Sequence, residues 1–217
     1  MTGILGGSFD PPHEGHLQLA RAVTQELGLK KLLFLPANRN PHKNATGAGA
    51  AERLRMLELA LEGQDPRFEI EPMELLEPPP SFTIDSLLRL QAREPGDYTL
   101  ILGQEVFADF LRWKDPQTIC DMVDLAIIRR HGVARVDLKP LLLKLGYRSL
   151  DDGAWVNGQG KKVWDLELPL VEASSTAIRQ GLQSLSPQQW MSSTPPVAGL
   201  QRAVWLFIKE FRLYTVK

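Results

Sequence analysis

Short apolar runs alternate along this chain with stretches of helical periodicity, and no other feature of the sequence constrains the fold as strongly. Runs of strand length stand at 32–35, 98–102, 125–128 and 163–170. Buried parallel strands have this continuous apolar character, and the helical stretches between them can cover the faces of the sheet. The sequence therefore predicts an α/β fold in which helices cover a parallel sheet.

Apolar residues at three- and four-residue steps mark the helical stretches. We expect a helix at about 13–27, which Gly28 caps at its C-terminus, and a second helix at 51–61. Further helices are expected after Ser81, which serves as N-cap, from about Ser175, and at 203–211. A first strand should end at Leu5, and a short one should span 68–70. The glycine-rich, polar segment 146–162 is expected to be a surface excursion. We find no repeat or linker, which predicts a single domain over 1–217.

The charge balance excludes one class of protein. The chain of 217 residues has 25 Lys and Arg against 26 Asp and Glu, whereas proteins that grip a nucleic-acid backbone usually carry a clear basic excess. The single cysteine, Cys120, cannot form an internal disulfide, which favours a reducing compartment. The apolar runs are far shorter than the roughly 20 residues of a membrane helix. We expect a cytoplasmic protein that binds neither nucleic acid nor membrane.

Residues 6–16 join the first strand to the first helix and read Gly-Gly-Ser-Phe-Asp-Pro-Pro-His-Glu-Gly-His. Ligands of open α/β sheets bind at this edge, and glycines let backbone N–H groups approach a phosphate. His13 and His16 can face the same way at the helix start and stabilise charge on a phosphoryl group. A plain turn, a core histidine or a zinc site are alternatives, but the strand–glycine–helix context favours a phosphate site.

This pattern resembles the signature of the nucleotidyltransferase superfamily with the H-x-G-H motif. Residues 173–179 are similar to its second signature, I-S-S-T-x-I-R, with alanine in place of the first isoleucine. Hydroxyl and N–H groups of 174–176 offer an anion site at a helix start, and Arg179 could fork onto phosphate oxygens. The resemblance implies a Rossmann-like, doubly wound, mainly parallel sheet with helices on both faces.

Further motifs resemble one branch of this superfamily, the bacterial nicotinate-nucleotide adenylyltransferases. They lie at 36–43, 51–57, 81–87, 102–105 with 111–113, and 213–214, so that the likeness covers nearly the whole chain. Three positions depart from the family pattern. Asn40 replaces a proline and should leave its loop less rigid, Glu105 replaces an aspartate and reaches one methylene further, and Phe82 lacks a tyrosine hydroxyl.

The resemblance implies a role for each matching residue. The catalytic residues would be His13, His16, Lys43 and Arg179, which also bring local positive charge into one cleft. ATP would be bound by Gly6, Gly7, Ser8, Phe9, Gly103, Glu105, Ser174, Ser175 and Thr176. Nicotinate mononucleotide would be bound by Asn38, Phe82, Thr83 and Trp113. No protein side chain is expected to hold a metal, and Mg²⁺ is expected on the ATP phosphates.

The reaction that the resemblance implies is adenylyl transfer from ATP to nicotinate mononucleotide, which yields nicotinate adenine dinucleotide and pyrophosphate in NAD biosynthesis. The attacking phosphate is already ionised near neutral pH, so catalysis reduces to positioning and charge neutralisation. Alternatives are a sister enzyme acting on nicotinamide mononucleotide or phosphopantetheine, a non-catalytic nucleotide sensor, and a metal hydrolase that uses the histidine pair. The chain could be a monomer or a homo-oligomer.

Overall fold

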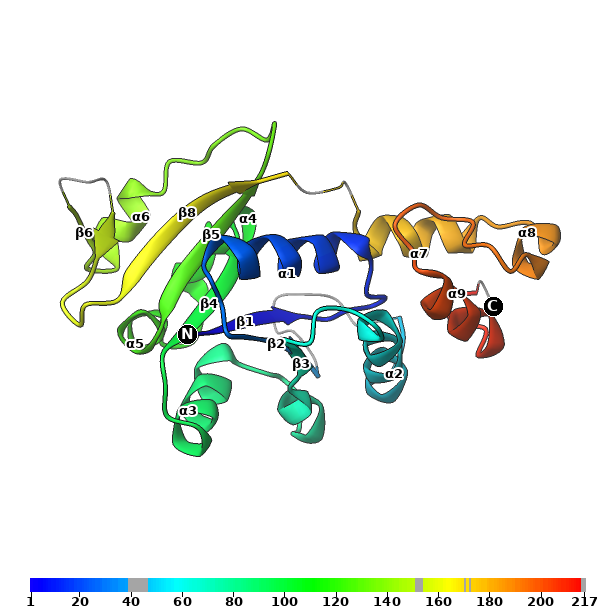
Figure 1. Ribbon diagram of the computed structural model, residues 1–217, viewed down its shortest axis with the longest axis horizontal. Helices are drawn as coiled ribbons and strands as arrows, with labels where there is room; N and C mark the ends of the chain where they lie inside the picture. The colour runs from blue at the N-terminus through cyan, green and yellow to red at the C-terminus, as the bar shows by residue number, and fades with distance from the viewer. Residues whose placement is uncertain (39–46, 151–153, 170, 172, 216–217) are drawn as a thin grey trace.

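The computed structural model describes residues 1–38, 47–150, 154–169, 171 and 173–215. Strands in these ranges form an eight-stranded sheet in the order β3-β2-β1-β4-β5-β8-β7-β6 (Figure 1). The strands are β1 (Thr2–Gly7), β2 (Lys31–Pro36), β3 (Phe68–Ile70), β4 (Tyr98–Gly103), β5 (Asp124–Arg130), β6 (Arg148–Ser149), β7 (Trp155–Val156) and β8 (Lys162–Leu168).

Helices connect most of these strands. They are α1 (Glu14–Glu26), α2 (Ala50–Leu61), α3 (Thr83–Arg93), α4 (Gln104–Phe107), α5 (Pro116–Met122), α6 (Lys139–Lys144), α7 (Ser175–Gln183), α8 (Pro187–Met191) and α9 (Arg202–Glu210). The described ranges also contain the short 3₁₀ helices η1 (Pro72–Leu76) and η2 (Phe110–Arg112). In the described part of the chain, no helix combines the length and hydrophobicity that crossing a membrane requires.

The order of the parallel strands reverses beside β1. The chain runs outward from β1 to β2 and β3, then returns to place β4 on the other side of β1. Leu5 of β1 therefore lies between Phe34 of β2 and Ile101 of β4. Strands β5 and β8 continue the parallel sheet, and β7 and β6 extend it in antiparallel fashion. Ligands of open α/β sheets bind beyond the carboxyl ends of the strands at such a reversal.

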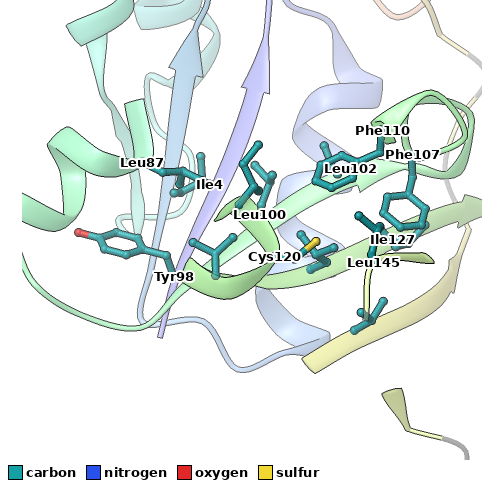
Figure 2. Packing of buried hydrophobic residues seen from close by; sticks show 14 of the residues in the cluster. Ile4, Leu87, Tyr98, Leu100, Leu102, Phe107, Phe110, Cys120, Ile127 and Leu145 are labelled. Atoms are coloured by element: carbon teal, nitrogen blue, oxygen red, sulfur yellow. The ribbon is translucent and has the colours of Figure 1, made fainter. Parts of the chain in front are cut away.

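Strands β1, β2, β4 and β5 bury side chains on both faces of the sheet, since successive residues of a strand point to opposite sides. Leu33, Leu100 and Ile127 belong to the apolar cluster on the face that α3 and α5 cover, part of which Figure 2 shows. Phe34 and Ile101 belong to the cluster on the opposite face, which α1 covers. The predicted α/β fold, with a doubly wound, mainly parallel sheet and helices on both faces, is confirmed.

A third apolar cluster joins the C-terminal helices to α2. Its buried residues include Met56 of α2, Ile178 of α7 and Trp205 of α9. Figure 1 shows α7, α8 and α9 grouped beside α2, at the opposite end of the molecule from β6. This packing holds the start of α7, which follows the last strand, close to the segment that follows β1.

Most of the predicted elements are confirmed within a few residues, but the cap of α3 is not. Ser81 is not its N-cap; Phe82 occupies that position. The hydroxyl oxygen of Ser81 instead accepts a hydrogen bond from the backbone N–H of Asn38 at 3.1 Å. The prediction was wrong because a partner from a distant loop uses the hydroxyl that would otherwise cap the helix.

The segment 146–162 is also more ordered than its composition indicates. The predicted surface excursion is wrong in that β6 and β7 extend the sheet, and Tyr147 and Asn157 are buried. The Asn157 side-chain amide donates to the carbonyl oxygen of Cys120 at 2.9 Å. The polar side chain of Asn157 points inward because a buried backbone carbonyl oxygen accepts its hydrogen bond. The short helices α5 and α6 were not predicted.

Candidate active site

The first signature motif lies where β1 ends and α1 begins. His13 is the N-cap of α1, and its backbone N–H donates to Nδ1 of His16 at 3.2 Å. The two imidazole rings are stacked, with their centroids 3.7 Å apart. The prediction that both histidines face the same way at the helix start is therefore confirmed.

The two imidazoles differ in their electrostatics. Because Nδ1 of His16 accepts a hydrogen bond, the neutral ring carries its proton on Nε2 and presents an N–H donor there. His13 is only 5% exposed, and burial lowers the pKa of its imidazole to about 4, with a further contribution from the charge of Arg130. His13 is neutral at pH 7, so the expectation that it brings positive charge to the cleft is wrong for the free protein.

Phe9 shapes the glycine turn. It is buried and has a φ of 48°, in the left-handed region that residues other than glycine seldom adopt. Its ring lies against Gly7, where a Cβ would be 3.1 Å from Phe9 Cζ, and meets the ring of His16 edge-on. A Cβ at Gly6 would meet no described atom within 4 Å. The turn thus combines a fixed aromatic ring with open space at the end of β1.

The second signature motif lies directly against the first, although more than 160 residues separate them. The hydroxyl oxygen of Ser174 caps α7 by accepting a backbone N–H. Ser175 Oγ donates to the carbonyl oxygen of Pro11 at 2.9 Å, and Arg179 Nη1 donates to that of Asp10 at 2.6 Å. The structure brings the two predicted phosphate-binding segments together at the switch point of the sheet.

The other residues predicted to bind ATP have varied surroundings. Thr176 Oγ1 accepts a hydrogen bond from Nη2 of Arg179 at 3.3 Å, which helps to orient the guanidinium. Gly103 ends β4, the neighbour of β1, and Glu105 stands exposed in the first turn of α4. Lys43 lies outside the described residues.

The predicted mononucleotide-binding residues gather at the start of α3. The side-chain amide of Asn38 donates to the carbonyl oxygen of Glu77 at 2.7 Å, so Asn38 lies beside the segment that leads into α3. Thr83 is the first residue of α3. Phe82 and Trp113 are half-buried against the same apolar cluster. Lys114, which follows Trp113 in sequence, has its ammonium 5.1 Å from the centroid of the Phe82 ring.

Sequence reasoning missed the role of Arg53, which is 1% exposed on α2. Its Nη1 donates to the carbonyl oxygens of Ser8 at 2.8 Å and Ala37 at 2.6 Å, and its Nη2 donates to that of Asn38 at 2.9 Å. One guanidinium therefore connects the glycine turn to the loop that begins after β2. The available signal was a charged residue on the apolar face of a helix, three positions before Met56.

Known proteins resemble this chain along its length. A family model described as cytidylyltransferase-like matches residues 4–181. A "probable nicotinate-nucleotide adenylyltransferase" of Listeria welshimeri is 32% identical over 100% of this chain and 98% of its own length. One of the same name from Thermomicrobium roseum is 35% identical over 82% of this chain and 78% of its own.

A solved structure has a similar fold. Plasmodium falciparum nicotinic acid mononucleotide adenylyltransferase, complexed with NaAD, matches 98% of this chain and 96% of its own with a TM-score of 0.71. At 16% sequence identity this similarity shows the fold alone.

Proposed function

The chain belongs to the cytidylyltransferase-like family, and on this premise we propose that it is a nicotinate-nucleotide adenylyltransferase. It transfers the adenylyl group of ATP to nicotinate mononucleotide, and its products are nicotinate adenine dinucleotide and pyrophosphate, a step of NAD biosynthesis. Relatives of that name at 31% and 32% identity over the full chain support this assignment.

One observation carries the proposal: the two signature motifs meet beyond the carboxyl end of β1. Ser175 and Arg179 of α7 donate to carbonyl oxygens of Pro11 and Asp10 in the turn after β1. The guanidinium of Arg179 is partly exposed, with 30% of the side chain accessible, so it can also bind an anion. We infer that Arg179 and His16 act on the same phosphate groups, because both lie where the two motifs meet, and phosphoryl transfer requires such charge stabilisation.

The proposed mechanism is an in-line displacement. A phosphate oxygen of the mononucleotide forms a bond to the α-phosphorus of ATP while the bond from that phosphorus to the departing pyrophosphate breaks. The nucleophile is ionised near neutral pH and needs no general base. His16 donates through Nε2–H to the α-phosphate oxygens, Arg179 binds the departing phosphates, and Lys43 shares this task.

His13 has a different role from His16 in this proposal. Its neutral ring stacks on His16, and its backbone N–H fixes the His16 tautomer. Nδ1 of His13 is buried and has no hydrogen-bond partner among the described residues. A buried polar atom without a partner is costly, so the site gains when a ligand group binds there.

We assign the pyridine ring of the mononucleotide to the region of Phe82 and Trp113. An electron-poor ring stacks favourably on an indole. In the first turn of α3, the N–H groups of Asp85 and Ser86 donate to the carbonyl oxygen of Phe82. Those of Thr83 and Ile84 have no partner among the described residues and suit the nicotinate carboxylate. Asn38 lies beside this segment, within reach of the mononucleotide phosphate.

We propose that ATP enters with Mg²⁺ on its phosphates. Among the described residues there is no cluster of three or more His, Cys, Asp or Glu side chains that could hold a metal ion. When bound, Mg²⁺ neutralises part of the phosphate charge.

The lone cysteine supports a cytoplasmic location.

The proposal is tested by measuring pyrophosphate release from ATP with nicotinate mononucleotide, nicotinamide mononucleotide and phosphopantetheine in parallel. We expect rapid release with the first and much slower release with the others. Faster release with either of the others would identify a sister enzyme, and ATP binding without release would identify a nucleotide sensor. Chelation of Mg²⁺ is expected to abolish release, and activity that survives chelation would contradict the role given to the metal.

A further inference from the structure

Asp10 is a buried carboxylate within the first signature motif, and it binds groups from three separate parts of the chain. It is 2% exposed. Its carboxylate accepts hydrogen bonds from the backbone N–H groups of Gly47 at 2.7 Å and Ala48 at 3.1 Å. It also accepts one from the Tyr214 hydroxyl at 2.6 Å. The last contact joins residues 204 positions apart in sequence.

Arg179 lies against the same residue but does not pair closely with its carboxylate. Nη1 of Arg179 donates to the backbone carbonyl oxygen of Asp10 at 2.6 Å, while the carboxylate Oδ2 is 3.7 Å from Nη1. The carboxylate is satisfied by its other donors, so it does not draw the guanidinium into a closer pair. Nη2 of Arg179 donates to Oγ1 of Thr176 at 3.3 Å, and the side chain is 30% exposed, so its other N–H groups can bind a further acceptor.

The ring of Tyr214 is fixed by packing as well as by its hydroxyl. A Cβ at Gly47 would lie 3.0 Å from the Tyr214 ring and 3.3 Å from Cδ of Arg179. Gly47 therefore lies against both Tyr214 and Arg179. Burial and the adjacent Asp10 carboxylate raise the pKa of Tyr214, so the hydroxyl keeps its proton and remains a donor.

We propose that Tyr214, near the C-terminus, is a positioning residue for adenylyl transfer. By donating to Asp10 it keeps this carboxylate from competing with ATP phosphates for the guanidinium of Arg179. Without the hydroxyl, Oδ1 of Asp10 would lose its shortest hydrogen bond and the carboxylate would take Arg179 as a replacement donor. This inference rests on the proposed function only through the role of Arg179 as a phosphate ligand.

The test uses Tyr214→Phe, which removes only the hydroxyl. Tyr98→Phe is a matched control, because Tyr98 is also buried and its hydroxyl donates to one acceptor at 2.6 Å, the carbonyl oxygen of Glu94. The Kd for ATP is measured by calorimetry without mononucleotide, so that no turnover is needed. We expect Tyr214→Phe to weaken ATP binding about tenfold, as for loss of one hydrogen bond to a charged group, and Tyr98→Phe to leave it unchanged.

A second measurement separates positioning from a general loss of stability. In an Arg179→Ala background, Tyr214→Phe should no longer change the Kd for ATP, because its effect passes through the missing guanidinium. In the active enzyme, kcat/KM for ATP should fall while the KM for the mononucleotide stays within about twofold. Gly47→Ala, whose Cβ would press on the Tyr214 ring and on Cδ of Arg179, should also weaken ATP binding and serves as a second variant should Tyr214→Phe fold poorly.

The inference is overturned if Tyr214→Phe and Gly47→Ala bind ATP as tightly as the wild type. It is equally overturned if the loss is the same with and without Arg179, or if both substrates are affected alike. An absence of pyrophosphate release by the wild type would contradict the proposed function alone, because the calorimetric comparison would still stand.

Discussion

The two sides of the candidate site are held together differently. The phosphate side, made of residues 6–16 and 174–179, depends on hydrogen bonds between polar groups distant in sequence, such as Ser175 to Pro11. The pyridine side, around Phe82 and Trp113, rests on an apolar cluster. Hydrogen bonds weaken steeply when their geometry changes, whereas apolar packing is non-directional. Small changes on the phosphate side should therefore affect the rate sharply, and changes on the pyridine side should act gradually.

The largest expected effect tests the phosphate side. His16→Ala removes the Nε2–H donor, and kcat should fall roughly 10²- to 10³-fold, the usual cost of losing one donor to a developing charge. The melting temperature should change little, because His16 is only partly buried. Steady-state pyrophosphate release and thermal melting check the two statements. Near-normal turnover would remove His16 from the mechanism.

Arg53 hydrogen-bonds to the glycine turn on the phosphate side and to the segment after β2, so its removal tests how much this connection stabilises the fold. Arg53→Leu removes the donor to the carbonyl oxygens of Ser8, Ala37 and Asn38, which are buried or partly buried. We expect a loss of about 3 kcal/mol in the free energy of unfolding, since each unsatisfied group costs about 1–3 kcal/mol and some will find water. Denaturant titration measures the loss.

Arg55→Leu is the matched control for Arg53→Leu, since Arg55 is exposed on the same helix and, among the described residues, forms an ion pair with nearby Glu58. It should change the free energy of unfolding by less than about 1 kcal/mol. Equal losses for the two variants would show that the Arg53 hydrogen bonds do not hold the loops together.

The buried histidine gives the phosphate side a pH dependence. The pKa of His13 is lowered from 6.5 to about 4 in the folded protein, so below pH 6.5 the unfolded chain binds a proton that the folded one does not. Stability is fully present above pH 6.5 and falls between pH 6.5 and pH 4, by about 3 kcal/mol in total. When the free energy of unfolding is measured across this pH range, it should fall less for His13→Gln than for the wild type. A wild-type loss equal to that of the variant would contradict the burial of a neutral ring.

The smallest effect is expected on the pyridine side. Trp113→Ala should raise the KM for nicotinate mononucleotide about tenfold, within the usual range for a lost stacking partner, and should leave the KM for ATP nearly unchanged. Trp190→Ala is the control, because Trp190 belongs to the C-terminal cluster. A rise in the KM for ATP as large as that for the mononucleotide would show that the two sides are not separate.

The sequence predicted the sheet and the two signature motifs because their signals are local. A buried strand is a continuous apolar run, and the histidine pair needs only a spacing of three residues. The hydrogen bonds of Ser81 and Asn157 could not be predicted for the opposite reason, because the partner in each lies more than 30 residues away. Arg53 was visible as a charge on an apolar helix face, but its carbonyl partners were not.

The sequence by itself determined the α/β class, the family resemblance and the residue types available for phosphate chemistry. The tertiary structure alone decided the protonation state of His13, because a pKa depends on burial and on neighbours such as Arg130. It also decided that Asp10, Arg179 and Tyr214 share one network, because the C-terminal helices pack against α2 and return the end of the chain to its beginning. Local chemistry can be predicted from residue order, but the contacts that adjust it arise only when distant segments pack together.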